Sequence, residues 1–301
     1  MPETTAATHP AIRQDHRRRV YEDPRIVIGH QKEAVDPDVM RLVQEDLEAF
    51  LGQPIEEIAR QWWDQREETE RQEHAALEHA TDERAIHAFY AATDRYLYEL
   101  GYWEAQRDKQ REFTKLWLAC QRFGVRRVLD FGGGVGGLSL FLVPRGIACD
   151  YHDLPGRTFE CARFRFQRRG LTIPMWRTLE ELPCAAYDAI VSYDVFEHLF
   201  DLEGACRRLA QSLRPGGWLI TKSTFSGGGA HLEKNFKYAD MRVYNAMLAR
   251  CGLAYRGRLK PDWRSELLRG LGYRYTVLGI RISPLVKYGG NFLLHQTPTT
   301  A

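Results

Sequence analysis

The 301-residue sequence predicts an α/β fold, in which a doubly wound, mostly parallel sheet follows an N-terminal helical extension. From residue 125 onward, short apolar runs alternate with helical patterns, and strands joined by helices form parallel sheets. A glycine-rich turn follows the first of these runs and indicates a nucleoside-bearing ligand. Residues 26–122 instead carry apolar side chains at the spacing of amphipathic helices.

We expect three parts along the chain. Residues 1–25 are polar and lack a helical period, which predicts a disordered tail. Residues 26–122 are expected to form a helical cap that builds a substrate pocket or a homodimer surface. Asp36 and Pro37 begin its first predicted helix, as an N-cap and a first-turn proline. Residues 123–301 are expected to form the ligand-binding sheet domain.

Strands and helices alternate through the sheet domain. Five strands are predicted in its alternating part, at residues 127–130, 147–152, 173–176, 187–192 and 218–223. Helices are predicted at residues 157–169, 202–213 and 238–251. Two further strands, at residues 276–282 and 292–296, are expected to close the sheet as a hairpin.

Composition excludes several classes of protein. The net charge of +2 predicts no nucleic-acid or anionic-membrane partner. None of the six cysteines forms a Cys-x-x-Cys pair, so we expect reduced thiols and no metal site. No apolar run reaches the ~20 residues of a membrane span, and no signal-peptide pattern is visible. The expected location is the cytoplasm.

An acid stands directly before the glycine-rich turn. Asp130 ends the first strand, and Gly132, Gly133 and Gly134 follow it. Glycine permits a sharp turn and removes the Cβ that would block a ligand. A dinucleotide fingerprint lacks the leading acid, whereas a carboxylate suits a ligand with a positive charge. Glycine-rich turns also occur in α/β proteins without nucleoside ligands.

A second acid follows the second strand. Asp153 lies where a carboxylate can accept hydrogen bonds from both hydroxyls of a ribose. Because Leu154 and Pro155 follow it, Asp153 also fits the N-cap of the next helix. The two roles are compatible.

Four motifs together resemble a class I S-adenosylmethionine-dependent methyltransferase. They lie at residues 128–137, 152–155, 182–198 and 213–217, in the order and spacing of that family. The resemblance covers residues 110–225, and residues 131–169 are also similar to small-molecule methyltransferases of bacterial biosynthetic clusters. It implies a seven-stranded Rossmann-like sheet with S-adenosyl-L-methionine as the cofactor.

The resemblance also implies the contacts of the methionine end of the cofactor. Asp130 would orient the glycine turn and interact with the amino group, directly or through water. The turn at Gly132, Gly133 and Gly134 would let the backbone lie against the methionine and ribose. Tyr193 follows the fourth strand, where the family's backbone meets the methionine end.

At the adenosine end, the resemblance assigns the ribose to Asp153 and the adenine face to Leu154. Many relatives carry an acid that contacts the adenine amino group. In this chain Thr178 and Leu179 occupy that region, and the Thr178 hydroxyl would accept the hydrogen bond instead.

Methyl transfer is an in-line displacement that needs an aligned nucleophile and sometimes a base. His198 and His231 are the predicted catalytic residues, and His152 is a further candidate. His198 follows Glu197 in a pair that recurs across the family, so a structural or cofactor-site role is the alternative. His231 lies in the loop after the fifth strand, which lines the substrate side of this fold.

Aromatic residues of the helical region predict a substrate pocket. Tyr90, Tyr98 and Trp103 would cover an apolar or aromatic acceptor, and Asn235 would contact it from the His231 loop. The alternative is that these aromatic residues form the core between the helices and the sheet. A sulfonium cation also rests against aromatic faces.

The expected function is methyl transfer to oxygen, nitrogen or carbon of a small-molecule acceptor, such as a natural product. Tyr193 and Asp194 replace the Asn/Asp-Pro-Pro-Tyr motif of amino-directed DNA enzymes. One alternative is another displacement, such as a cyclisation, on the same fold. An inactive cofactor-binding partner protein is a second, and an RNA methyltransferase is a third, disfavoured by the low charge.

Overall fold

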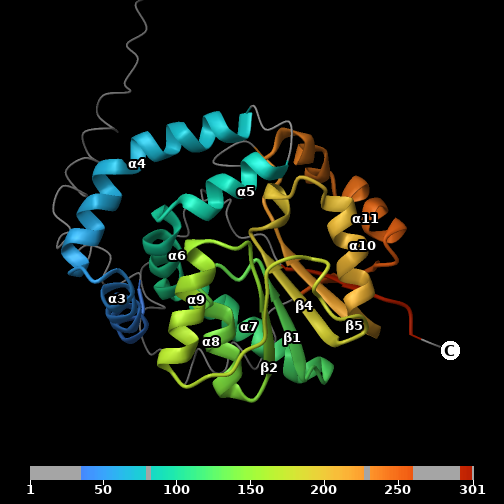
Figure 1. Cartoon of the computed structure of the whole chain (residues 1–301). Coiled ribbons are helices and arrows are strands. Elements are labelled where there is room, and N and C mark those ends of the chain that lie inside the picture. The colour runs from blue at the N-terminus through green and yellow to red at the C-terminus, as the bar shows by residue number, and fades with distance from the viewer. Residues whose placement is uncertain (1–34, 79–82, 227–230, 260–291, 300–301) are drawn as a thin grey trace, which may run out of the picture.

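The computed structural model describes residues 35–78, 83–226, 231–259 and 292–299 (Figure 1). These residues form one seven-stranded sheet in the order β3-β2-β1-β4-β5-β7-β6. The first five strands are parallel, and β7 runs antiparallel to both of its neighbours. The strands are β1 Arg127–Phe131, β2 Ala148–His152, β3 Met175–Trp176, β4 Tyr187–Tyr193, β5 Leu213–Lys222, β6 Ala254–Arg258 and β7 Leu293–Gln296. This arrangement confirms the predicted fold class.

Helices cover both faces of the sheet (Figure 1). On one face α7 (Arg107–Phe123), α8 (Gly137–Leu142) and α9 (Arg157–Arg168) pack on residues such as Val128 and Val191. On the other face α10 (Leu202–Ser212) and α11 (Met241–Arg250) pack on residues such as Leu129 and Ile190. Because both faces are buried, consecutive apolar residues form the middle of the central strands, as at Val128-Leu129 in β1 and Ala189-Ile190-Val191 in β4.

Four further described helices come before α7 in the chain: α3 (Pro37–Leu51), α4 (Ile55–Glu78), α5 (Glu83–Ala92) and α6 (Arg95–Ala105). The predicted start of the first is confirmed, because the Asp36 side chain accepts hydrogen bonds from the amides of Asp38 and Val39. In Figure 1, α4 and α5 run across the top of the view, while α3 and α6 lie beside α8 and α9. The helices share an apolar cluster with Val135 and Cys161 of the sheet domain.

A buried ion-pair network joins these helices to the glycine turn. Arg165 on α9 is 2% exposed and donates to Asp46 of α3 at 2.8 Å and to Glu104 of α6 at 2.7 and 2.9 Å. It also donates to the carbonyl of Val135 at 2.7 Å. Burial lowers the pKa of the guanidinium, but the two carboxylates raise it above its usual value. The Arg165 guanidinium therefore ties α3, α6 and α9 together.

One difference from the predicted elements lies at the antiparallel end of the sheet. Strand β6 at Ala254–Arg258 is not predicted by the sequence, because its residues are mostly polar or exposed. Strand β7 confirms the strand predicted at residues 292–296, and it pairs with β6. The strand predicted at residues 276–282 and the tail at residues 1–25 lie outside the described residues. The three-part division stays a prediction, and α7, which precedes the predicted boundary, packs into the sheet core.

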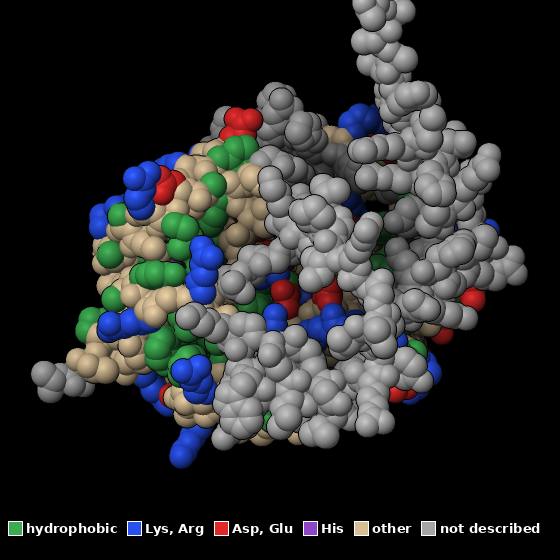
Figure 2. Space-filling model, turned by 180° about the vertical axis from the view of Figure 1, so that it is seen from behind, with side chains coloured by type: hydrophobic (Ala, Val, Ile, Leu, Met, Phe, Trp, Pro, Cys, Tyr) green, Lys and Arg blue, Asp and Glu red, His purple; other side chains and the backbone are tan. Residues whose placement is uncertain are grey.

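Figure 2 shows Lys and Arg side chains spread singly over the described part of one face. All six cysteines are unpaired, and Cys184 is the exposed one. Within the described ranges, every helix is too short or too polar to cross a membrane.

Candidate functional site

The glycine turn opens into a cavity of about 250 Å³ at the carboxyl ends of β1, β2 and β4. The strand order reverses between β1 and β4, and ligands of doubly wound sheets bind at that reversal. Parallel register brings the ends together, because Phe131 pairs with both His152 and Ser192. The predicted cofactor residues Asp130, Gly132, Gly133, Gly134, Asp153, Leu154 and Tyr193 all line this cavity.

The turn needs glycine for two separate reasons. Gly134 has φ +56°, in the left-handed region that L side chains rarely adopt. A Cβ on Gly133 would lie 2.7 Å from the Tyr151 ring and 3.0 Å from Cγ of Asp130. The amides of Gly132 and Gly133 both donate to the carbonyl of His152, at 2.8 and 3.0 Å. The backbone is therefore fixed with its Cα atoms exposed to the cavity, a cradle that fits an amphiphilic nucleoside.

Asp130 holds the helix that follows the turn. One of its oxygens, Oδ2, accepts from the amide of Ser139 at 3.1 Å and from its hydroxyl at 2.8 Å. Burial raises the pKa of Asp130 to about 6. The carboxylate thus orients the turn and α8 together, while its contact with the cofactor amino group stays a prediction.

Asp153 is tied directly to the turn. Its Oδ2 accepts from the amide of Gly134 at 2.6 Å, and its Oδ1 accepts from the amide of Leu154 at 2.7 Å. The N-cap position of α9 is occupied by Gly156 without a side-chain hydrogen bond, so Asp153 does not cap that helix. Each carboxylate oxygen can accept two hydrogen bonds, so these backbone contacts leave acceptor capacity for ribose hydroxyls.

We expect cofactor affinity to fall as the pH drops through about 6. Burial raises the pKa of Asp153 to about 6, so below that pH the carboxyl is protonated and loses acceptor capacity. Calorimetry with S-adenosylhomocysteine between pH 5 and 8 measures this directly. Asp153→Asn is expected to bind weakly at every pH. A wild-type affinity that is constant across this range would show that Asp153 does not hold the ribose.

His152 also lines this cavity and brings a polar side chain to it. Its ring stacks on Phe131 with centroids 4.6 Å apart, and neither ring nitrogen has a partner within the described structure. Burial lowers the pKa of His152 to about 4, so the ring is neutral and offers one donor and one acceptor. Thr178 is exposed and Leu179 packs against the sheet core, and neither lines the cavity. His152 therefore lines the cavity together with Asp153 and Leu154, whereas the predicted residues Thr178 and Leu179 do not.

A second cavity of about 1030 Å³ adjoins the first, and the two share wall residues. Its size suits an organic acceptor. Its lining comes from α6, α7, the end of β5 and the loop that carries His231. The residues common to both cavities are Tyr96, Leu100, Trp103, Lys109, Tyr193, Asp194 and His198. These residues form the junction between the cavities.

Four polar groups gather at the junction. Lys222 donates to Glu112 at 2.5 Å and to the Tyr193 hydroxyl at 3.1 Å, and that hydroxyl donates to Glu112. Nζ of Lys109 lies 3.0 Å from the centre of the Tyr193 ring. Burial lowers the pKa of Lys109 to about 8, although Asp194 and Glu112 oppose the shift. A lysine in this pKa range is suited to act as a general base.

Sequence analysis missed Lys109, Glu112 and Lys222. One signal was available: Tyr193 and Lys222 end the neighbouring strands β4 and β5 and are register partners. Lys109 and Glu112 are three residues apart on α7 and therefore share a helix face. The sequence does not specify that this face meets the strand ends.

The predicted substrate residues separate into two groups. Tyr90 lines the first cavity, and Trp103 lines both. Tyr98 is 6% exposed, belongs to the apolar cluster of the N-terminal helices and lines neither cavity. Asn235 is also buried, and its amide donates to the carbonyls of Phe196, Glu197 and Leu199. Asn235 therefore shapes a loop beneath the second cavity rather than its lining.

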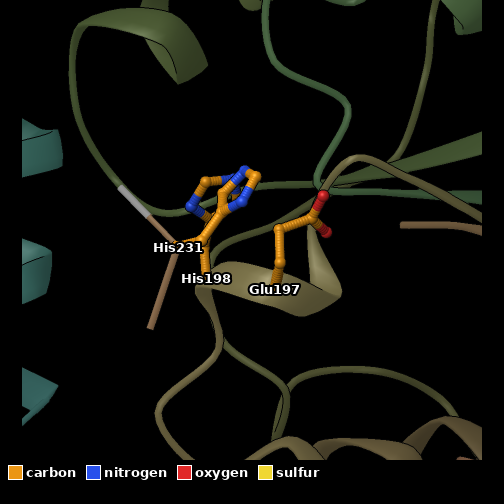
Figure 3. Close-up of side chains that lie close together, drawn as sticks. All are labelled: Glu197, His198 and His231. Atoms are coloured by element: carbon orange, nitrogen blue, oxygen red, sulfur yellow. The ribbon is translucent and has the colours of Figure 1, made fainter. Parts of the chain in front are cut away.

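The two predicted catalytic histidines lie side by side. Their ring centroids are 5.1 Å apart, and both rings line the second cavity. Figure 3 shows His198 rising from the short helix η2 (Phe196–His198) toward the His231 ring, with the Glu197 carboxylate beside them. Nδ1 of His198 is 3.4 Å from the Tyr90 hydroxyl. The structure thus brings both histidines to the wall of the second cavity, and their catalytic role stays a prediction.

Comparison with known proteins gives a family match. Residues 101–275 match a family model described as a methyltransferase domain. A ubiquinone biosynthesis O-methyltransferase of Methylocella silvestris is 30% identical over 183 residues, which cover 57% of this chain and 66% of that protein. The corresponding enzyme of Chromobacterium violaceum is 27% identical over 175 residues, covering 54% and 71%. This chain therefore spans about two thirds of the length of these relatives.

Solved structures give more distant matches. An S-adenosylmethionine-dependent methyltransferase from Clostridium acetobutylicum has a TM-score of 0.44 and 13% identity, covering 63% of this chain and 92% of that one. A phosphoethanolamine N-methyltransferase of Haemonchus contortus in complex with S-adenosyl-L-methionine has a TM-score of 0.42 and 19% identity, covering 62% and 52%.

Proposed function

The chain belongs to the methyltransferase domain family and uses S-adenosylmethionine, and from this premise we propose that it methylates a hydroxyl group of a small aromatic acceptor. The proposal depends on one observation: the second cavity adjoins the first cavity and shares lining residues with it. Bound S-adenosylmethionine supplies an electrophilic methyl group. The protein's task is then to hold an acceptor oxygen in line with it.

The lining of the second cavity favours an aromatic acceptor. Tyr96 and Trp103 offer ring faces, and Leu100 adds apolar surface between them. Aromatic side chains bind flat apolar groups through offset or edge-to-face contacts. Oxygen as the acceptor atom is supported by the similarity to ubiquinone biosynthesis O-methyltransferases.

Proton removal from that hydroxyl is assigned to Lys109. The neutral amine accepts the proton, and the charge that forms is next to Glu112 and Asp194. Lys222 bonds both Glu112 and Tyr193 and so fixes the wall on which Lys109 lies. His198 and His231 then need not act as bases.

The test is a product assay with defined acceptors. The purified chain is incubated with S-adenosylmethionine and either 3,4-dihydroxybenzoate, 4-aminobenzoate or a buffer blank, and products are identified by mass spectrometry. We expect O-methylated product and equimolar S-adenosylhomocysteine from the dihydroxy acceptor only. Methylation of the amine alone would overturn the choice of oxygen.

The same assay separates the other functions considered from the sequence. An acceptor that is rearranged without a gain of one methyl mass would indicate a different displacement. Cofactor binding without turnover of any phenolic acceptor would indicate an inactive binding protein. Either outcome would replace the proposed function.

A further inference from the structure

Three side chains with metal-ligating atoms, Glu197, His198 and His231, meet beside the second cavity (Figure 3). One ligand atom from each lies within 4.8 Å of the other two. Three ligands of one Zn²⁺ ion lie roughly 3.4–3.6 Å from one another, because each bond is about 2.1 Å long. If each of the three atoms moves inward by less than about 1 Å, they surround one ion.

Glu197 supplies a buried oxygen that needs a positive partner. The residue is 1% exposed, and its Oε1 accepts from the amide of Thr224 at 2.9 Å. Its Oε2 is buried and has no hydrogen-bond partner within the described residues. A buried carboxylate oxygen without a partner is costly, and a cation bound there would remove that cost.

His231 is held in the orientation of a metal ligand. Its Nδ1 is 2.7 Å from the carbonyl oxygen of Ser226. Because a carbonyl only accepts, Nδ1 carries the hydrogen and Nε2 keeps a lone pair. Metal-binding histidines commonly donate their other nitrogen to a carbonyl in this way, which fixes the tautomer and the ring orientation.

The two segments that carry the ligands are joined independently of any ion. The amide of Leu232 donates to the carbonyl of Glu197 at 3.1 Å, which places His231 beside the η2 helix. The buried Asn235 amide donates to the carbonyls of Glu197 and Leu199, at 3.3 and 2.9 Å. The protein therefore holds the three ligands close together before a metal arrives.

We propose that Glu197, His198 and His231 bind one divalent transition-metal ion. Two imidazoles and one carboxylate suit Zn²⁺, Mn²⁺ or Fe²⁺ better than Mg²⁺ or Ca²⁺, which prefer oxygen ligands. The sequence predicts no metal site, because that prediction considered only cysteine ligands and the cysteines lack Cys-x-x-Cys spacing. The ligands come instead from two segments that only the fold brings together.

The site faces the acceptor. All three ligands line the second cavity, and three protein ligands leave coordination positions open toward it. This role rests on the proposed function: the ion would bind an acceptor oxygen, fix its position and lower the pKa of its hydroxyl. A catecholic acceptor, with two neighbouring oxygens, fits open positions on one ion best.

Metal binding is measured without any acceptor, so its outcome is independent of the proposed function. The experiment uses the full chain with the substitution Cys184→Ser, which removes the exposed thiol as a competing ligand. This protein is treated with a chelator and then titrated with ZnCl₂ by calorimetry. We expect one equivalent to bind at micromolar concentration or below. Glu197→Gln and His231→Ala are each expected to weaken binding at least about tenfold.

The matched control is Glu233→Gln, an exposed acid two residues from His231, which should leave zinc affinity unchanged. Calorimetry with S-adenosylhomocysteine confirms that each variant is folded. A Co²⁺-loaded sample should show visible bands of nitrogen and oxygen ligation. Absence of zinc binding at micromolar concentration, or equal affinity in Glu197→Gln, His231→Ala and Glu233→Gln, would overturn the site.

Discussion

Replacing Arg165 with methionine is expected to lower the free energy of unfolding by about 3–5 kcal/mol, the cost of leaving a buried charge without its partner. Glu104 would lose the guanidinium that donates two hydrogen bonds to it, in a site where Arg165 itself is 2% exposed, whereas Asp46 would keep its pair with Arg169. Urea unfolding at neutral pH measures the change. Because Arg165 also donates to the Val135 carbonyl, the glycine turn loosens and cofactor affinity should fall as well.

Two controls separate buried charge from lost packing. Arg41→Met removes an exposed pair with Glu45 on α3 and should cost less than about 1 kcal/mol. Adding Glu104→Leu to Arg165→Met removes the uncompensated carboxylate, while Asp46 keeps its pair with Arg169, and should recover part of the loss. If Arg165→Met alone is as stable as the wild type, the network does not hold the helices on the sheet domain.

The fold was predictable because its signals are local. Alternation of apolar runs and helical patterns predicted strands β1 to β5, and Gly132 to Gly134 located the ligand cavity. Strand β6 lacks such a signal, because most of its side chains are exposed and it is fixed by pairing with β7. A strand of this kind is determined by its neighbour rather than by its own sequence.

The site was predictable only in part, since its two halves differ in origin. The predicted cofactor residues follow consecutive strand ends, so Asp130 and Asp153 could be placed by counting along the chain. The second cavity is assembled from α6, α7 and two loops that are distant in sequence. Tyr98 and Trp103 illustrate the limit: both are aromatic residues of α6, yet one is buried among helices and the other lines both cavities.

Replacing Lys109 with methionine is expected to lower kcat at least about 100-fold while cofactor affinity stays near the wild-type value, because a general base contributes 10²–10⁴ to the rate. Burial lowers the pKa of Lys109 to about 8, so the neutral, proton-accepting form grows as the pH rises through 8. The wild-type rate should therefore increase through pH 8 and then level off. In Lys109→Met that increase should be absent.

The matched control is Lys115→Met on the same helix, a half-buried lysine that lines neither cavity, and it should keep both kcat and the pH profile. Lys109→Arg preserves the charge over the Tyr193 ring but cannot be deprotonated in this pH range. If Lys109 only positions Tyr193, the arginine variant should retain most of the activity and the rise through pH 8. If it is the base, the arginine variant should be as slow as the methionine variant, because only a neutral amine can take the acceptor's proton.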